Sequence, residues 1–217
     1  MTLPSSGGFS ARSLLLVALR TTAFTLLLCG LVYPLAVTAA AQLVFPARAA
    51  GSLATDDRGR IVGSLFIGQG FASPAYFQPR PSAAGERGWD PTASGGSNLG
   101  PTSQKLRDRA AADVARLQRE NPGAPPVPAE LVLASGSGLD PEISPEAALW
   151  QLPRVARARD VAEARVREVL GDAVDGRDLG FLGEPRVNVL ALNLALDRQF
   201  GRPVPGTTPA PAAAPAR

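Results

Sequence analysis

TTAFTLLLCGLVYPLAVTAAAQLVF, residues 21–45, decides the fold of this chain because it is long, apolar and free of charge. An α-helix rises about 1.5 Å per residue, so this stretch would extend about 37 Å as a helix. The hydrocarbon core of a bilayer is about 30 Å thick. The stretch therefore predicts one transmembrane helix over residues 21–45, tilted enough to take up its extra length.

This apolar segment can be interpreted as a signal peptide, a lipoprotein signal or a retained membrane anchor. A signal peptide would use residues 23–35 as its core and be cleaved in the small-residue region Ala39–Ala41. A lipoprotein would be modified at Cys29, but the three preceding leucines do not provide the small residue that such a site needs. The apolar stretch continues past the alanines to Phe45, which favours a retained membrane anchor.

Pro34 lies in the middle of the predicted span and removes one backbone hydrogen-bond donor. We therefore expect a kink between Gly30 and Pro34. The kink is either without consequence or shapes the helix to fit a partner helix, and Gly30 would let that helix approach closely. The residues before the span include Arg12 and Arg20 but no acid, which favours residues 1–20 in the cytoplasm and the main domain outside.

The composition of the chain excludes several classes of function and sets the size of the domain that follows the span. The 217 residues leave room for one compact domain, predicted over residues 46–201, and for a disordered Pro/Ala-rich tail over 202–217. The net charge is only +3 and charges of both signs alternate after the span, so no nucleic-acid partner is expected. The absence of His excludes Ser-His-Asp and Cys-His catalysis and His-based zinc sites. The single cysteine lies in the span, so no intrachain disulfide can form.

The domain is predicted to be α+β and rich in loops. Residues 68–100 carry dense turn motifs interleaved with aromatic residues, which favours an ordered loop that packs on the domain. The predicted elements are a strand over Arg60–Ile67, a helix from a Thr102 or Ser103 cap to Glu120, a strand over Leu131–Ala134, a helix from a Ser144 cap that is broken or kinked at Pro153, a helix with an Asp160–Glu163 capping box that ends at Gly171, and a helix over Asn188–Phe200.

The Gly-rich stretch from Ser135 to Asp140 follows a predicted strand and precedes a helix, as phosphate-binding loops do. Its spacing matches no dinucleotide fingerprint, however. It is either a structural turn that needs glycine at positive φ or a nucleotide site. Asp140 and Glu142 could bind a cation or exchange protons, but such residues are more typical of a turn or a cap. No catalytic or metal-ligating residue is predicted, and the candidates for nucleotide binding are Ser135, Gly136, Ser137, Gly138 and Gln151.

Several separate stretches together resemble the KdpC family, the small single-span subunits of bacterial Kdp potassium-pumping ATPases. The resemblance covers roughly residues 20–200. It rests on Gly30–Leu35, Gly63-Ser64, Ile67–Gln69 with Phe71, Tyr76-Phe77, Arg80–Ala83, Ser94–Leu99, Ala134-Ser135, Gly138–Asp140, Ile143–Pro145, Ala147-Ala148, Gln151, Arg154–Ala156, Pro185–Asn188 and Leu192–Leu196.

The resemblance implies a non-catalytic accessory subunit that assembles and stabilises a high-affinity, ATP-driven potassium uptake complex in the bacterial inner membrane. Its partners would be a channel-like potassium-translocating subunit, a P-type ATPase subunit and a very small single-span subunit, with potassium as the substrate of the complex. The phosphorylation motif Asp-Lys-Thr-Gly of P-type ATPases does not occur in this chain. The family is also linked to ATP binding, and the resemblance implies no other cofactor.

We expect the loop Phe71–Leu99 and the kinked span to form the surface that docks on the channel-like subunit. The interface candidates are Tyr33, Pro34, Phe71, Tyr76, Phe77, Arg80 and Asn98. An alternative of another class is an exported or membrane-anchored binding protein unrelated to ion transport. In its exported form, cleavage after the alanines would release a mature chain that starts near Gln42.

Overall fold

The computed structural model describes residues 10–203. The chain divides into two compact units, one up to Ser52 and one from Leu53 onward. The described part of the first unit is helical: α1 (Ala11–Leu27), the π-helical segment η1 (Leu28–Val32), α2 (Tyr33–Val44) and the short α3 (Pro46–Ala49). The continuous stretch Ala11–Val44 has 34 residues and is long and apolar enough to cross a membrane. It starts earlier than the predicted span, because Ser10 caps the helix by accepting a hydrogen bond from the Ser13 amide.

The backbone of this long helix leaves the α-helical pattern near Gly30 and Pro34, where the sequence predicts a kink. Pro34 has no N–H, so the Gly30 carbonyl lacks its usual α-helical donor. The Tyr33 amide donates instead to the Leu28 carbonyl, five residues back, which is the π-helical pattern. Single π-turns of this kind are one of the recognised causes of helix kinks.

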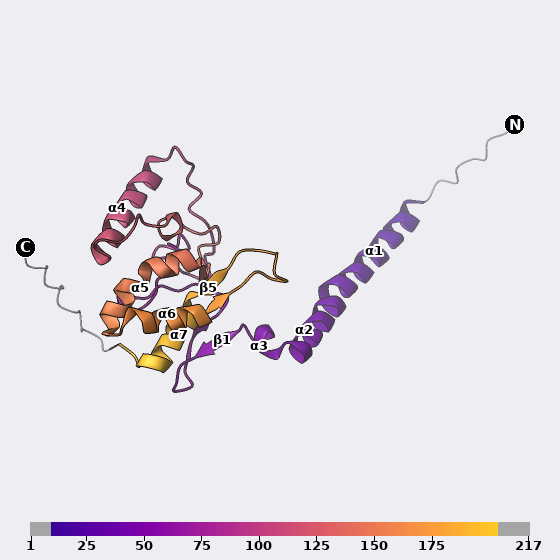
Figure 1. The fold of residues 1–217 in the computed structure, drawn as a ribbon. Coiled ribbons are helices and arrows are strands. Elements are labelled where there is room, and N and C mark those ends of the chain that lie inside the picture. The colour runs from indigo at the N-terminus through magenta and orange to yellow at the C-terminus, as the bar shows by residue number, and fades with distance from the viewer. Residues whose placement is uncertain (1–9, 204–217) are drawn as a thin grey trace, which may run out of the picture. The chain divides into compact units, whose positions relative to one another are not determined.

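The second unit is α+β, as predicted, with short strands and longer helices (Figure 1). Strands β1 (Leu53–Thr55) and β2 (Ile61–Ser64) form an antiparallel hairpin, so only part of the predicted strand 60–67 is extended. A second antiparallel sheet has the order β3-β5-β4. Its strands are β3 (Glu142–Ile143), β4 (Val174–Asp175) and β5 (Arg186–Asn188).

Four helices complete the second unit: α4 (Gln104–Glu120), α5 (Pro145–Arg159), α6 (Glu163–Asp172) and α7 (Val189–Phe200). Helix α6 contacts both α5 and α7, and α5 and α7 contact β5 (Figure 1). The core lies among these elements and includes Leu152, Val155, Val166, Val187, Leu192 and Leu196. Two predicted N-caps, Ser103 and Ser144, are confirmed, since each accepts a hydrogen bond from an amide of the following helical turn. Asn188, predicted as the first residue of its helix, caps α7 in the same way.

The residues between β2 and α4 form a long irregular loop, as predicted, because none of them lies in a helix or strand. The predicted strand over Leu131–Ala134 is wrong. A 3₁₀ turn, η2 (Ala129–Leu131), stands there instead, and the apolar pair Leu131 and Val132 is buried without a neighbouring strand. A short apolar run fits a buried turn as well as it fits a strand.

Two predictions about helix ends are also corrected. Helix α5 is not broken at Pro153, one of the two predicted outcomes, but continues through it to Arg159. Pro153 leaves the carbonyl of Leu149 without its helical donor. Asp160 does not cap α6. It ends α5 in the left-handed conformation at φ 53°, which Asp tolerates better than most residues, and α6 begins after Ala162 with no side-chain cap.

Candidate functional site

Residues 74–78, which we call the strap, lie in neither helix nor strand, yet buried side-chain amides pair their backbone. Asn193 of α7 accepts from the Phe77 N–H at 2.9 Å and donates to the Phe77 carbonyl at 3.0 Å. Gln151 of α5 makes the same two bonds with Gln78, at 2.8 and 3.0 Å. Each amide therefore replaces a neighbouring strand, and the buried backbone of the strap keeps its hydrogen bonds.

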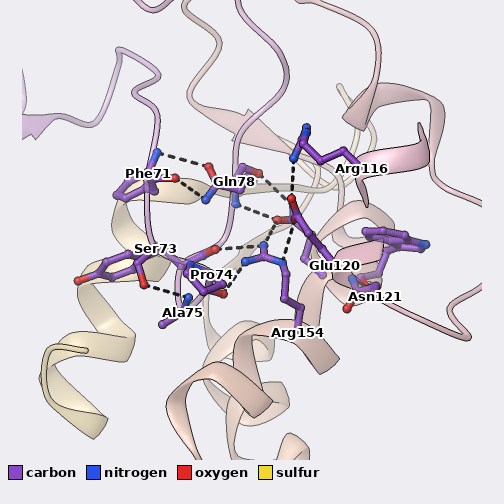
Figure 2. Close-up of polar contacts among 12 residues, drawn as sticks. Phe71, Ser73, Pro74, Ala75, Gln78, Arg116, Glu120, Asn121 and Arg154 are labelled. Carbon is purple, nitrogen blue, oxygen red and sulfur yellow. Dashed lines mark hydrogen bonds and ion pairs between the residues drawn. The ribbon is translucent and has the colours of Figure 1, made fainter. Parts of the chain in front are cut away.

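Arg154 of α5 contacts both the strap and the end of α4. Its guanidinium donates to the carbonyl oxygens of Pro74 and Tyr76, and to Gln151 Oε1 at 2.8 Å (Figure 2). The carboxylate of Glu120, at the end of α4, lies 3.8 Å from Arg154 Nε. Burial lowers the pKa of Arg154 to about 10, and the Glu120 carboxylate opposes that shift. Arg154 therefore stays charged at neutral pH.

Arg159, five residues further along α5, binds the same end of the strap, at the carbonyl between the two that Arg154 binds. Its Nε donates to the Ala75 carbonyl at 2.7 Å and its Nη2 to Asp197 Oδ1 at 2.8 Å. The guanidinium lies over the Tyr76 ring, 5.0 Å from the ring centroid, and the Tyr76 hydroxyl donates to Asp197 Oδ2 at 2.9 Å. Burial and the hydrogen bond to Asp197 raise the pKa of Tyr76 to about 12. We call Gln151, Arg154, Arg159, Asn193 and Asp197 the clamp.

A cavity of about 650 Å³ lies beside the clamp, between the loop that carries the strap and helices α4 and α5. Its walls include Phe71, Trp89, Arg109, Arg116, Glu120 and Arg154. Arg116 binds Asp113 and Glu120, at 3.2 and 2.9 Å, while the buried Nε groups of Arg109 and Arg154 have no hydrogen-bond partner. The cavity therefore combines aromatic walls with guanidinium N–H groups that could bind acceptor oxygens. Among the described residues, no group of three His, Cys, Asp or Glu side chains could hold a metal ion.

Comparison with known proteins identifies the family. The family described as "KdpC: K+-transporting ATPase, c chain" matches residues 15–198. The chain belongs to the KdpC family. A potassium-transporting ATPase KdpC subunit of Myxococcus xanthus is 63% identical over 198 residues, which are 91% of this chain and 93% of the relative. The KdpC subunit of Methylobacterium nodulans is 56% identical over 81% of this chain and 92% of its own length, and that of Caulobacter sp. is 54% identical over 82% and 89%.

Family membership confirms the resemblance found in the sequence. The chain is of the type that serves as a subunit of the potassium-transporting P-type ATPase complex, and its N-terminal apolar helix indicates a single-pass protein of the inner membrane. The KdpC relatives align over nearly all of their own length. The residues matched by the KdpC family include the long helix from residue 15, the strap and the clamp.

The KdpC interface candidates occupy very different environments. Phe77 is fully buried, at 0% exposure, and belongs to the core. Phe71 and Tyr76 are half-buried, with ring centroids 5.5 Å apart, and Arg80 forms an ion pair with Asp140 at 3.2 Å. The remaining candidates, Asn98 in the loop and Tyr33 and Pro34 in the long helix, are exposed.

The nucleotide candidates of this KdpC chain separate into two places. Residues 135–138 pack against the loop 81–96, where the Ser135 amide donates to the Pro81 carbonyl and Ser137 O accepts from the Gly95 amide at 2.8 Å. Gln151 belongs to the clamp instead. At the start of α5, the amide and the hydroxyl of Ser144 both donate to Glu130 at 2.8 Å, so a carboxylate of the chain itself binds at this helix start. Gly138 has φ +69°, as the structural-turn interpretation requires, and nucleotide binding stays a prediction.

Four of the clamp residues, Arg154, Arg159, Asn193 and Asp197, are not among the site residues that the sequence predicts. One signal could have found two of them, because Asn193 and Asp197 are polar residues one helical turn apart within the apolar run of α7. A polar residue on a buried helix face needs a partner, and here the partners come from the strap, more than a hundred residues earlier in the chain.

Proposed function

We propose that this chain is a non-catalytic accessory subunit that assembles and stabilises an ATP-driven potassium uptake complex. Its partners are a channel-like potassium-translocating subunit, a P-type ATPase subunit and a very small single-span subunit. The second unit docks over the channel-like subunit on the outer side of the inner membrane, with the N-terminus inside. The observation that carries the proposal is the match to the KdpC family over residues 15–198, which covers both units.

The long helix supports this role because it offers features that suit helix–helix contact. All of its described large apolar side chains, among them Leu26 and Leu35, are exposed and so available to lipid or to a partner helix. The π-helical segment η1 carries Gly30, where the missing side chain permits close approach of a neighbouring helix.

The clamp supports a role in assembly because it fixes the shape of a long loop. Backbone without regular partners would otherwise be mobile, and ordering it on binding would reduce the affinity for a partner. Here Asn193 and Gln151 fix the strap at four hydrogen bonds, and Arg154 and Arg159 add further bonds to its carbonyl groups. A preordered surface of this kind suits a subunit that holds other subunits in place.

The test uses an affinity tag after Arg217 on the full chain, expressed with its neighbouring subunits and extracted in mild detergent. We expect co-elution of a polytopic channel-like subunit and a P-type ATPase subunit, together with potassium-stimulated ATP hydrolysis. An unrelated single-span protein with the same tag is the control. Elution of this chain alone would refute the proposal and favour the exported or anchored binding protein.

A further inference from the structure

Helix α4 lines the cavity beside the clamp with charged side chains. Four charged residues recur at helical spacing along one face of this helix and all line the cavity: Arg109, Asp113, Arg116 and Glu120. Leu117 is the one buried residue of α4, all of which the structure describes. A helix face that packs on its own domain is normally apolar. Packing within the domain therefore does not account for the charged face of α4.

The residues that line the cavity leave one positive charge uncompensated. They include three arginines and two acidic residues, a difference of one. Arg116 binds both Asp113 and Glu120, and Glu120 also lies 3.8 Å from Arg154 Nε (Figure 2). These two arginines and two carboxylates balance each other. The remaining charge belongs to Arg109, whose guanidinium forms no ion pair and no hydrogen bond with any described residue.

Two guanidinium groups at the cavity wall are partly withdrawn from water without a compensating bond. The Nε groups of Arg109 and Arg154 are buried and have no hydrogen-bond partner, and the side chain of Arg154 is only 5% exposed. The terminal nitrogens of Arg109 are neither buried nor paired with a described residue, so they can donate to a ligand. Native structures pair nearly all of their buried polar groups. An anion bound beside Arg109 would compensate for the water that its guanidinium has lost.

The loop between β2 and α4 adds an aromatic wall to the same cavity. Trp89 has φ +53°, which is uncommon for a bulky residue. Its amide donates to Ser82 Oγ at 2.7 Å, and its ring lies so close to Gly70 that an added Cβ would be 2.9 Å from Trp89 Cζ3. Phe71, the next residue, also lines the cavity. Strained backbone that the surrounding structure holds in place clusters at functional sites, which favours a ligand-binding role for this wall.

We propose that this cavity binds a carboxylate attached to a planar apolar body, with Arg109 as the residue that binds the carboxylate. A guanidinium suits a carboxylate because it can donate two parallel hydrogen bonds, and aromatic rings such as that of Trp89 stack on planar groups. The volume of about 650 Å³ is within the usual range for small-ligand sites. One carboxylate balances the uncompensated charge, whereas Asp113 and Glu120 would repel a ligand with several negative charges.

The carboxylate belongs either to a free organic acid or to an acidic side chain of a neighbouring subunit that fills the same cavity. The chemistry that recognises it is the same in both cases, and the experiment distinguishes the two sources. The inference concerns the second unit by itself and does not depend on the proposed function.

The first experiment titrates 2-naphthoate, a carboxylate on a planar apolar body, into the full chain held in lipid nanodiscs, and measures the heat of binding against empty nanodiscs. We expect saturable binding, and binding about tenfold weaker for the neutral 2-naphthamide, which has a similar shape without the charge. Arg109→Gln should weaken the binding of 2-naphthoate about tenfold and leave that of the amide unchanged. Arg107→Gln is the control, because Arg107 is an exposed residue of the same helix outside the cavity, and it should leave both unchanged.

The second variant is Trp89→Asn, which removes the aromatic wall and suits the positive φ. We expect weaker binding of both the acid and the amide, at an unchanged or higher thermal midpoint of the second unit. No saturable binding of 2-naphthoate to the wild-type chain, equal binding of acid and amide, or full binding in Arg109→Gln would overturn the inference.

The same titration on the assembled complex separates the two sources of the carboxylate. Binding of 2-naphthoate as tight as to the chain alone would support a free acid as the ligand. Loss of binding in the complex would support an acidic side chain of another subunit in the cavity. A chain that elutes without partners would refute the proposed function but not this inference, because the titration of the chain alone needs no other subunit.

Discussion

At the scale of single residues, two glycines of one loop are predicted to behave differently. A Cβ added to Gly138, at φ +69°, would lie 2.7 Å from the Gly95 carbonyl oxygen and 2.8 Å from the Ala84 amide. A Cβ on Gly136 would meet nothing within 4 Å. We expect Gly138→Ala to lower the free energy of unfolding by about 2–4 kcal/mol, because strain and overlap add. Gly136→Ala should change it by less than about 0.5 kcal/mol in the same denaturant titration.

Equal effects of the two glycine variants would contradict this account of the loop. The sequence alone could not separate them, because both glycines follow a serine in the same Ser-Gly-Ser-Gly run. What distinguishes Gly138 is the close approach of a loop more than forty residues earlier in the chain. Contacts between distant parts of a chain leave no local sequence pattern.

Tyr76 predicts a dependence of stability on alkaline pH. The folded chain holds the Tyr76 proton with a pKa of about 12, above the value of 10.0 for a free tyrosine, because burial and Asp197 favour the neutral phenol. The stabilising contribution is therefore fully present below pH 10 and is lost as the pH rises from 10 to 12. Tyr76 is partly solvated, so we expect a loss of about 1 kcal/mol in denaturant titrations across this window.

The matched variant for this test is Tyr76→Phe. This variant lacks the titrating hydroxyl, so the part of the fall in unfolding free energy between pH 10 and 12 that is due to Tyr76 should vanish. The free energy of unfolding at pH 8 should be lower than that of the wild type, because Asp197 loses one hydrogen-bond donor. If the free energy of unfolding falls equally in both proteins between pH 10 and 12, a group other than Tyr76 causes the fall.

At the scale of elements, helix starts were predictable where the decisive contact is local. Ser103, Ser144 and Asn188 each bind an amide three residues along, so the pattern is complete within one turn of sequence. Asp160 matches a capping pattern equally well, yet it ends α5 instead of starting α6. The course of the chain between two helices depends on how they pack, and a capping pattern does not contain that information.

The clamp predicts that one side chain of α7 fixes an element far away in the sequence. Asn193→Ala leaves the buried N–H and carbonyl of Phe77 without partners, so we expect the free energy of unfolding to fall by about 2–3 kcal/mol. Hydrogen exchange should speed up at the amides of Phe77 and Gln78 while the amides of α7 keep their protection. Gln199→Ala, an exposed change on the same helix, is the control and should have neither effect. Unchanged exchange at Phe77 in Asn193→Ala would refute the role assigned to the amide.

At the scale of the whole molecule, the sequence predicted the family and the fold class well but the site only in part. The membrane helix and the family motifs lie in continuous stretches, which a single sequence displays directly. The clamp and the strap bring together residues from three distant segments, and among the clamp residues that the sequence did not select, only Asn193 and Asp197, in the apolar run of α7, differed in pattern from surface residues. Phe77 was selected for its aromatic character, but packing places it in the core, where no partner can reach it.

The long helix is predicted to remain attached to the mature chain and to have a fixed orientation in the membrane. The apolar stretch continues to Phe45 and no acid precedes it, so we expect an uncleaved anchor with its N-terminus inside and the second unit outside. Alkaline phosphatase fused after Arg217 should then be active and green fluorescent protein at the same place dark, whereas fusions at the N-terminus should give the opposite result. Mass spectrometry of the membrane fraction should find the N-terminal segment intact. A soluble mature chain that starts near Gln42 would contradict the anchor, because the helix would then have served only as a signal for export.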